Sequence, residues 1–178
     1  MQTGVIPHII NNFHIYLGDG NNINTPMFGI SSEITLPDLS AITETISGSG
    51  ILGELEVKNP GHYSAINMDI PFIGYTDDMF KIDPTEFTML TLRSCSQSQV
   101  KATRELKYSQ MKIVLGGTTK DYKLGSVKIG SQMGSNISLS IDYIKIDIDG
   151  TVARELDKLN EVFTVFDEDK LAKIRNMC

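Results

Sequence analysis

The chain has 178 residues, of which 40% are hydrophobic and 21% are charged, and its formal net charge at pH 7 is −6. This composition excludes a disordered chain and a fibrous repeat, and the length allows one well-buried core but not two ordinary domains. Because 22 acidic residues outnumber 16 basic ones without a basic cluster, nucleic-acid binding by phosphate neutralisation is disfavoured. We therefore expect a single domain over residues 1–178.

The beginning of the chain shows no targeting signal. It lacks the basic flank and long apolar run of a signal peptide, and no window approaches the apolar length of a membrane span. We expect synthesis in the cytoplasm and no membrane insertion. Two cysteines make no disulfide framework, so Cys95 and Cys178 are predicted to be reduced thiols, with Cys95 as a small strand residue.

Apolar and polar residues alternate in several runs along the chain. Such a pattern is typical of strands with one buried and one solvated face. Turn signals rich in glycine and asparagine separate the runs. The predicted fold is mainly β (α+β), an antiparallel sandwich or barrel-like sheet. The alternating runs are 13–17, 34–36, 55–57, 111–115 and 137–143, and the turn signals lie at 18–22, 59–61 and 116–119.

A glycine-rich segment lies between two of the runs that can be extended. Ser47-Gly48-Ser49-Gly50 has short side chains and few restrictions on its backbone angles. Such a segment suits a loop that reaches out and is contacted by another molecule. We predict an extended hairpin arm over about 42–57 that serves assembly.

The same segment matches the dinucleotide-binding pattern G-x-G-x-x-G between Gly48 and Gly53. That pattern needs a buried strand before it and a helix after it, whose amide end holds pyrophosphate. Residues 42–46 are too polar for a central parallel strand, and residues 54–58 alternate like a strand. Nucleotide binding is therefore disfavoured, and no cofactor is expected.

Two short helices are predicted. The first covers residues 76–82, with Thr76 as its cap, acidic residues in its first turn and Pro84 ending it. The second covers about 167–177, with Asp167 as its cap and basic residues near its end.

Two strands change their buried face in mid-course. After Tyr143 the apolar set moves by one residue to Ile144, and a similar change occurs across Gly125-Ser126. A one-residue slip moves side chains to the opposite face, so we predict a bulge or sharp bend at both places. Such bends are typical of barrels and strongly coiled sheets.

The segment Asp147-Ile148-Asp149-Gly150-Thr151 resembles the nucleophile motif of haloacid dehalogenase-type phosphotransferases. In that family the first Asp attacks phosphorus and the second acts as a general acid. Too little chain follows Thr151 for the later phosphate- and magnesium-binding segments, and a strand ending in an Asp-Gly turn explains the residues. A phosphatase using Asp147 and Asp149 is the alternative outside the structural class.

No other catalytic or metal site is predicted. His8, His14 and His62 are separated from one another and from Cys95 without any ligand spacing. No arrangement of serine, histidine and acid stands out in the sequence. We expect neither a catalytic residue nor a metal.

The order of these segments resembles the major tail tube protein family of contractile-tailed (myovirus) phages and R-type bacteriocins. Residues 13–21 resemble the family's opening strand and polar turn, residues 33–39 its next strand, and residues 48–57 its glycine-rich arm and return strand. Residues 149–171 resemble its closing hairpin and terminal helix. The final turn departs from the family pattern, because it reads Phe166-Asp167-Glu168-Asp169 where Asn-Gly is expected.

The resemblance implies a structural subunit rather than an enzyme. Six copies would close into a ring, and stacked rings would form the inner tube of a contractile injection apparatus that conducts DNA or ions. The partners implied are further copies, the sheath protein, and baseplate and tail-terminator proteins. The subunit would reside in the bacterial cytoplasm during assembly, then in a virion tail or a released bacteriocin particle. A secretion-system tube is the alternative within this class.

The resemblance also suggests roles for particular residues. The arm residues Ser47, Gly48, Ser49, Gly50 and Ile51 would contact the neighbouring ring. Acids facing the channel would keep DNA from adhering within a screening length of about 8 Å at physiological salt. Alternation does not say which face is inside, so a solvated outer face is equally consistent with these acids. The candidate channel acids are Glu54, Glu56 and Asp69, and the candidates for a basic sheath surface are Asp167, Glu168 and Asp169.

Overall fold

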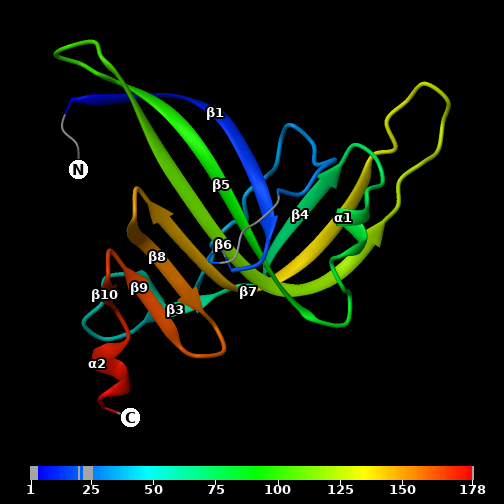
Figure 1. The fold of residues 1–178 in the computed structure, drawn as a ribbon. Coiled ribbons are helices and arrows are strands. Elements are labelled where there is room, and N and C mark those ends of the chain that lie inside the picture. Colours follow the sequence, from blue (N-terminus) through cyan, green and yellow to red (C-terminus); the bar gives the residue numbers. More distant parts are fainter. Residues whose placement is uncertain (1–3, 20, 22–25, 178) are drawn as a thin grey trace.

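The computed structural model describes residues 4–19, 21 and 26–177 (Figure 1). Within this part of the chain the secondary structure consists of ten strands and two short helices. The strands are β1 (Val5–Leu17), β2 (Ala41–Ser47), β3 (Glu54–Tyr63), β4 (Ile66–Phe72), β5 (Phe87–Val100), β6 (Leu106–Lys123), β7 (Ser135–Ile148), β8 (Thr151–Asp157), β9 (Val162–Val165) and β10 (Glu168–Asp169), and the helices are α1 (Asp77–Phe80) and α2 (Ala172–Arg175).

All strand pairings are antiparallel, and they form two sheets. The main sheet has the order β1-β5-β6-β7-β8-β9-β10, with β4 also paired to β7, and the second sheet contains only β2 and β3. The predicted mainly antiparallel β fold with two short helices is confirmed. No helix in the described ranges is long and apolar enough to cross a membrane.

The main sheet branches in the middle of β7. The first half of β7, up to Ile141, pairs with β4, whereas the second half, from Tyr143, pairs with β8. Asp142 has no register partner in β6, so it forms a bulge between the two halves. The predicted change of the buried face of this strand is confirmed, and the bulge lies one residue before Tyr143. Opposite it, a Cβ on Gly117 would lie 2.0 Å from the Ser140 carbonyl oxygen, so the close approach requires glycine.

Two predicted turns are wrong, because their glycines lie within strands. Residues 116–119 lie within β6, where glycine permits the bend against β7. Residues 59–61 lie within β3, where Gly61 has φ +77 at an irregularity of the β2–β3 register. The first predicted turn, at residues 18–22, lies only partly within the described residues.

The predicted bend at Gly125-Ser126 is also wrong. β6 ends at Lys123, and the Ser126 N–H donates to the Met133 carbonyl over 2.9 Å, which closes a projecting loop. A Cβ on Gly125 would lie 2.2 Å from the same Met133 oxygen. The slip in the apolar pattern therefore marks the base of a loop and not a bent strand.

Strand assignments differ in two further places. Residues 34–36 were predicted as strand but form irregular chain, because no described strand pairs with them. β4 and β5 were not predicted. The outer part of β5 contains Ser96-Gln97-Ser98-Gln99, which shows no apolar alternation and is held by the two neighbouring strands β1 and β6.

Of the two predicted helices, only the first has its predicted cap. Thr76 caps α1, and its hydroxyl accepts from the Met79 N–H over 3.4 Å, as predicted. α2 is shorter than predicted, because Phe166 and Asp167 have φ values of 48° and 60° and turn the chain between β9 and β10. Asp167 is therefore in a turn and does not cap α2, which begins after Leu171.

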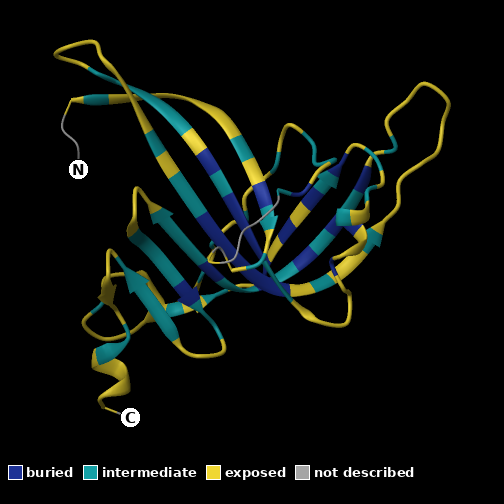
Figure 2. Cartoon of the chain, in the orientation of Figure 1, coloured by how far each residue is buried: buried dark blue, intermediate teal, exposed yellow. Residues whose placement is uncertain are grey.

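The hydrophobic core lies where β4, β5, β6 and β7 converge (Figure 2). Each fully buried aliphatic or aromatic side chain contributes about 1.5–3 kcal/mol relative to an exposed one. Packing across the bent sheet therefore stabilises the body of the molecule. The buried residues are Ile15, Met27, Ile66, Met68, Ile70, Phe72, Met79, Ile82, Leu90, Leu92, Ile113, Leu115, Ile137, Leu139, Ile141, Ile144 and Leu156.

Candidate assembly surfaces

The β2–β3 hairpin, called the arm below, is a separate two-stranded sheet. Its register pairs Thr45 with Glu56 and Ile46 with Leu55. The six-residue connection from Gly48 to Gly53 turns with φ values of +90° at Gly50 and +95° at Gly53, which explains the glycine-rich sequence. Instead of the helix that a dinucleotide site needs, β3 follows directly.

The two faces of the arm differ in chemistry. Glu54 and Glu56 lie on one face, because cross-strand pairing alternates them with Leu55. The other face carries Ile46 and Leu55, whose side chains are 39% and 51% exposed. A two-stranded hairpin is marginally stable in water by itself. The arm thus presents an apolar face that the rest of its own chain leaves uncovered.

The base of the arm is anchored to the C-terminal segment. The Tyr63 ring packs edge-on against Phe163 of β9, with ring centroids 5.8 Å apart. A Cβ on Gly61 would lie 3.1 Å from Leu171, so glycine lets these segments meet. The Lys158 ammonium donates to the Ser64 carbonyl over 2.8 Å. The arm is therefore fixed at its base and exposed at its tip.

The structure brings together two of the three candidate channel acids. Glu54 and Glu56 share the polar face of the arm. Asp69 lies in β4 of the main sheet, on the solvent side opposite buried Met68 and Ile70, and accepts from the Ser138 hydroxyl over 2.5 Å. These acids therefore belong to two separate surfaces.

The candidate sheath-facing acids are partly engaged within the chain. Glu168 pairs with Lys170, and Asp169 pairs with Arg175 of α2. The hydrogen bond from Lys170 holds the pKa of Glu168 below its ordinary value. Internal pairing reduces the charge that Glu168 and Asp169 offer to a partner, whereas Asp167 lies exposed in the turn.

The segment from Asp147 to Thr151 forms the tight hairpin between β7 and β8. Asp149 and Gly150 have φ values of 51° and 86°, as a two-residue turn of this kind requires. The Asp147 carboxylate accepts from the Gly150 N–H over 2.8 Å, and the Asp149 carboxylate accepts from the Gln110 N–H over 2.8 Å. Both acids satisfy backbone donors, so the predicted Asp-Gly turn is confirmed.

Beside this hairpin, β7 and β8 share a polar cluster on the side of the sheet opposite the core. The Tyr143 hydroxyl donates to Glu155 over 2.8 Å, and Lys145 lies 3.4 Å from the same carboxylate. Burial and the hydrogen bond to Glu155 raise the pKa of Tyr143 far above its ordinary value. Lys145 and Glu155 thus pair with each other within this cluster. Among the described residues, no group of three or more His, Cys, Asp or Glu side chains could hold a metal ion.

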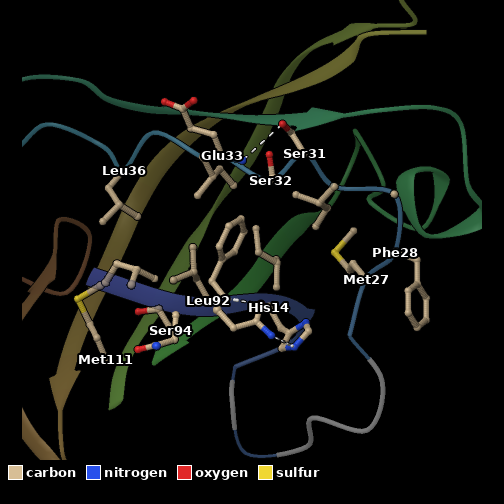
Figure 3. Close-up of a pocket in the computed structure, with 18 residues that line it drawn as sticks. His14, Met27, Phe28, Ser31, Ser32, Glu33, Leu36, Leu92, Ser94 and Met111 are labelled. Atoms are coloured by element: carbon tan, nitrogen blue, oxygen red, sulfur yellow. Dashed lines mark hydrogen bonds between the residues drawn. The ribbon is translucent and has the colours of Figure 1, made fainter. Parts of the chain in front are cut away.

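An apolar groove of about 660 Å³ lies between β1 and residues 27–36 (Figure 3). Met27 and Leu36 line it from the connecting segment, and Leu92 and Met111 line it from the sheet. Ser94 also lines it, and its buried hydroxyl has no hydrogen-bond partner in the described part of the chain. Sequence analysis missed this groove, because its walls come from segments far apart in the chain.

One edge of the main sheet is open next to the groove. β1 pairs with β5 on one side, and from Val5 to Phe13 no described strand pairs with its other side. At the other end of the sheet lies β10, which has only two residues. An open, long strand edge is a template for pairing with another chain. The β1 edge is therefore a candidate surface for contact between subunits.

The chain is similar to known phage tail tube proteins. A family model described as "Phage tail tube protein FII" matches residues 7–177. The tail tube protein of Escherichia phage P2 is 26% identical over 149 residues, which cover 83% of this chain and 86% of that protein. Among solved structures, a chain in the 6-fold symmetrised cryo-EM structure of the anti-feeding prophage (AFP) baseplate matches 76% of this chain and 89% of its own length, with 9% identity and a TM-score of 0.42.

Proposed function

Because the chain belongs to the phage tail tube protein FII family, we propose that it forms stacked hexameric rings in the inner tube of a contractile injection apparatus. Membership of the family makes the chain a structural subunit of a phage tail tube, located in the virion tail. The resemblance drawn from the order of the sequence segments is thereby confirmed.

The open β1 edge carries this proposal. A sheet with a long unpaired edge tends to aggregate unless another strand or a covering segment closes it. In a closed ring each copy supplies the missing neighbour for the next, which removes the exposed edges. The adjoining groove adds apolar surface to the same side of β1. Both features favour lateral association between identical copies.

The arm is the proposed contact between rings. Residues 47–51 project from a hairpin that the main sheet does not pair with, and Leu52 beside them is fully exposed. The apolar face with Ile46 and Leu55 would be covered by the neighbouring ring. The arm over about 42–57 thereby acts as the assembly element of the subunit.

For the channel wall we retain Asp69 as the candidate, because it lies on the polar face of the main sheet. Glu54 and Glu56 lie on the arm and would face the channel only where the polar face of the arm turns inward. An acidic wall would repel passing DNA over about 8 Å at physiological salt. DNA would pass without specific binding.

The remaining partners follow from the same reading. Asp167 is the sheath-facing candidate with the most available charge, since Glu168 and Asp169 pair with cations of the same chain. Baseplate and tail-terminator proteins would cap the two ends of the tube. The subunit would accumulate in the bacterial cytoplasm before assembly into a phage tail or an R-type bacteriocin. A secretion-system tube would form similar rings, but the family match to phage tail tubes favours the phage reading.

Negative-stain electron microscopy of the purified protein tests the proposal. Rings of six copies and stacked tubes are expected, and deletion of Ser47 to Gly50 is expected to leave a folded protein that forms no stacked tubes. Lone monomers at high concentration would contradict the assembly role, and tubes from the deletion variant would remove the arm from the ring contact.

We assign no catalytic role to Asp147 or Asp149. Asp147→Asn should assemble like the wild type, and neither protein should hydrolyse a phosphate monoester such as p-nitrophenyl phosphate. Phosphatase activity that disappears in Asp147→Asn would support the enzyme alternative instead.

A further inference from the structure

The tip of the β5–β6 hairpin is basic in a chain that is acidic overall. Lys101, Arg104 and Lys107 lie within seven residues, and all three are exposed. None of them belongs to a salt bridge in the described residues, whose ion pairs lie elsewhere. Glu105 is the acidic residue in this stretch of the chain, and its carboxylate accepts from the Thr103 hydroxyl over 3.1 Å. These cations are therefore available to a partner.

The backbone of this basic tip is ordered by several hydrogen bonds. The Arg104 N–H donates to the Val100 carbonyl over 2.8 Å, and the Val100 N–H donates to the Glu105 carbonyl over 2.9 Å. The Gln99 side chain donates to the Arg104 carbonyl over 2.9 Å. The Lys101 N–H donates to the Gly4 carbonyl over 2.6 Å, which ties in the start of β1. The cations thus sit on a defined surface.

An exposed apolar stripe lies next to the basic tip. Register places Ile6, Gln99 and Leu106 in one row across the sheet, and Ile9, Gln97 and Tyr108 in the next row on the same face. The four apolar members of these rows are 48–63% exposed. Apolar surface beside unpaired cations suits a partner that carries apolar residues and carboxylates together.

The arm carries both kinds of side chain. Glu44 lies on its apolar face, because it pairs with Val57, whereas Glu54 and Glu56 lie on the opposite face. All three glutamates are exposed and take part in no salt bridge of the described structure. The apolar residues Ile42, Ile46, Leu55 and Val57 are 39–51% exposed. In Figure 1 the basic tip lies at the upper left and the arm near β10 and α2 at the lower left, so one copy cannot join them.

We infer that the arm of one copy binds the basic tip of a second copy. This inference rests on the proposed stacking of rings and identifies the surface that receives the arm. The arm and the basic tip are different surfaces. In a bound pair, one copy therefore keeps a free basic tip and the other keeps a free arm. Further copies can bind to these surfaces, so the contact propagates from ring to ring. Opposite charges select the head-to-tail orientation, and like charges oppose stacking in reverse.

Charge reversal on each surface tests the pairing. K101E/R104E/K107E and E44K/E54K/E56K are each expected to raise the protein concentration needed for tubes at least about tenfold, as expected for the loss of several interfacial charge pairs. Combining both sets restores opposite charges and should return this concentration to within about threefold of the wild-type value. Tube length in negative stain and sedimentation of tubes measure the effect, and circular dichroism checks folding.

A matched control separates local pairing from net charge. K120E/K123E/K128E changes the net charge as much as the tip variant does, at exposed positions outside the basic tip. Tubes from this control should form at the wild-type concentration. Tip or arm variants that assemble like the control, or a combined variant that stays defective while folded, would overturn the inference.

Zero-length carbodiimide cross-linking of wild-type tubes tests the contact without any substitution. Mass spectrometry should find Glu54 or Glu56 linked to Lys101 or Lys107, and the links should disappear when tubes are dissociated before the reaction. Tubes without such links would also overturn the inference while leaving the proposed function intact. If the wild type forms no rings or tubes, the proposed function itself fails.

Discussion

The main sheet and the arm are both antiparallel, yet they differ in how their side chains are covered. In the main sheet, Ile70, Ile137 and Leu139 are at most 2% exposed. In the arm, every residue from Ile42 to Pro60 is at least partly exposed, and its apolar face has no cover within the chain. The main sheet buries its hydrophobic surface within the chain, whereas the arm leaves its hydrophobic surface exposed to a partner.

This difference separates folding from assembly. Burial in the bent main sheet supplies the free energy that holds the monomer together. The arm contributes little to that free energy, because a two-stranded hairpin with both faces exposed is marginal. Substitutions in the main sheet should therefore change the stability of the monomer, whereas substitutions in the arm should change tube formation.

The largest expected effect on stability is at Gly117. Gly117→Ala would place a Cβ 2.0 Å from the Ser140 carbonyl oxygen, and the backbone of the bent sheet would have to move. We expect a loss of about 3 kcal/mol in the free energy of unfolding, measured by urea denaturation of the unassembled protein. Gly48→Ala in the arm is the matched control, because no atom lies within 4 Å of its added Cβ. Equal losses in both variants would contradict the distinction between the two regions.

A smaller effect is expected at Asp78, which holds the segment before β2 to α1. Its carboxylate accepts from the Phe28 N–H over 3.0 Å and pairs with Lys81 at 2.6 Å. The hydrogen bond from Lys81, followed by that from Phe28, lowers the pKa of Asp78 below 3.8. Because the folded pKa is lowered, the ionised group stabilises the fold above pH 3.8, and this stability is lost as the pH falls through the folded pKa.

Asp78→Asn should therefore cost about 1 kcal/mol in the free energy of unfolding at pH 7. The gap to the wild type should shrink below pH 3.8. Urea denaturation across pH measures both values, and Asp77→Asn, in the same helical turn, is the control with little expected change. A gap that stays constant at acidic pH would show that the carboxylate charge is not responsible.

The smallest effect, and one of opposite sign, is expected at Phe166. This residue has φ 48° in the turn between β9 and β10, where a bulky side chain is disfavoured and asparagine is tolerated. Phe166→Asn should raise the free energy of unfolding by about 0.5–1 kcal/mol. Leu159→Asn replaces another exposed apolar residue at an ordinary φ and should change stability by less than about 0.5 kcal/mol. A loss of stability at Phe166 would point to packing by its ring.

Strands could be predicted where one face is buried in the core. Ile137, Leu139 and Ile141 alternate with polar residues, and the slip after them predicted the bulge that the structure places at Asp142. The same alternation occurs at Ile66, Met68 and Ile70 in β4. The outer half of β5 has serines on one face and glutamines on the other, so only its pairing with neighbouring strands makes it a strand.

Glycine led to both correct and incorrect predictions, because its missing Cβ permits two different local structures. At Gly50 and Gly53 it allows positive φ in a connection, as predicted. At Gly117 it allows two backbones to approach inside a sheet, which sequence alone does not distinguish from a turn. The composition of the segment around Gly48 indicated an exposed connection. The basic tip was missed although Lys101, Arg104 and Lys107 lie within seven residues, because the sequence does not show that the turn between β5 and β6 gathers them on one exposed tip.

Hydrogen–deuterium exchange of the arm, compared between dissociated subunits and assembled tubes, tests the central claim most directly. In dissociated subunits the amides of β2 and β3 should exchange rapidly, while those at the centre of β6 and β7 should be protected. In tubes the arm amides should become protected, with little change in the main sheet. Arm amides that are already protected in dissociated subunits, or that stay unprotected in tubes, would contradict the claim that a second copy covers the arm.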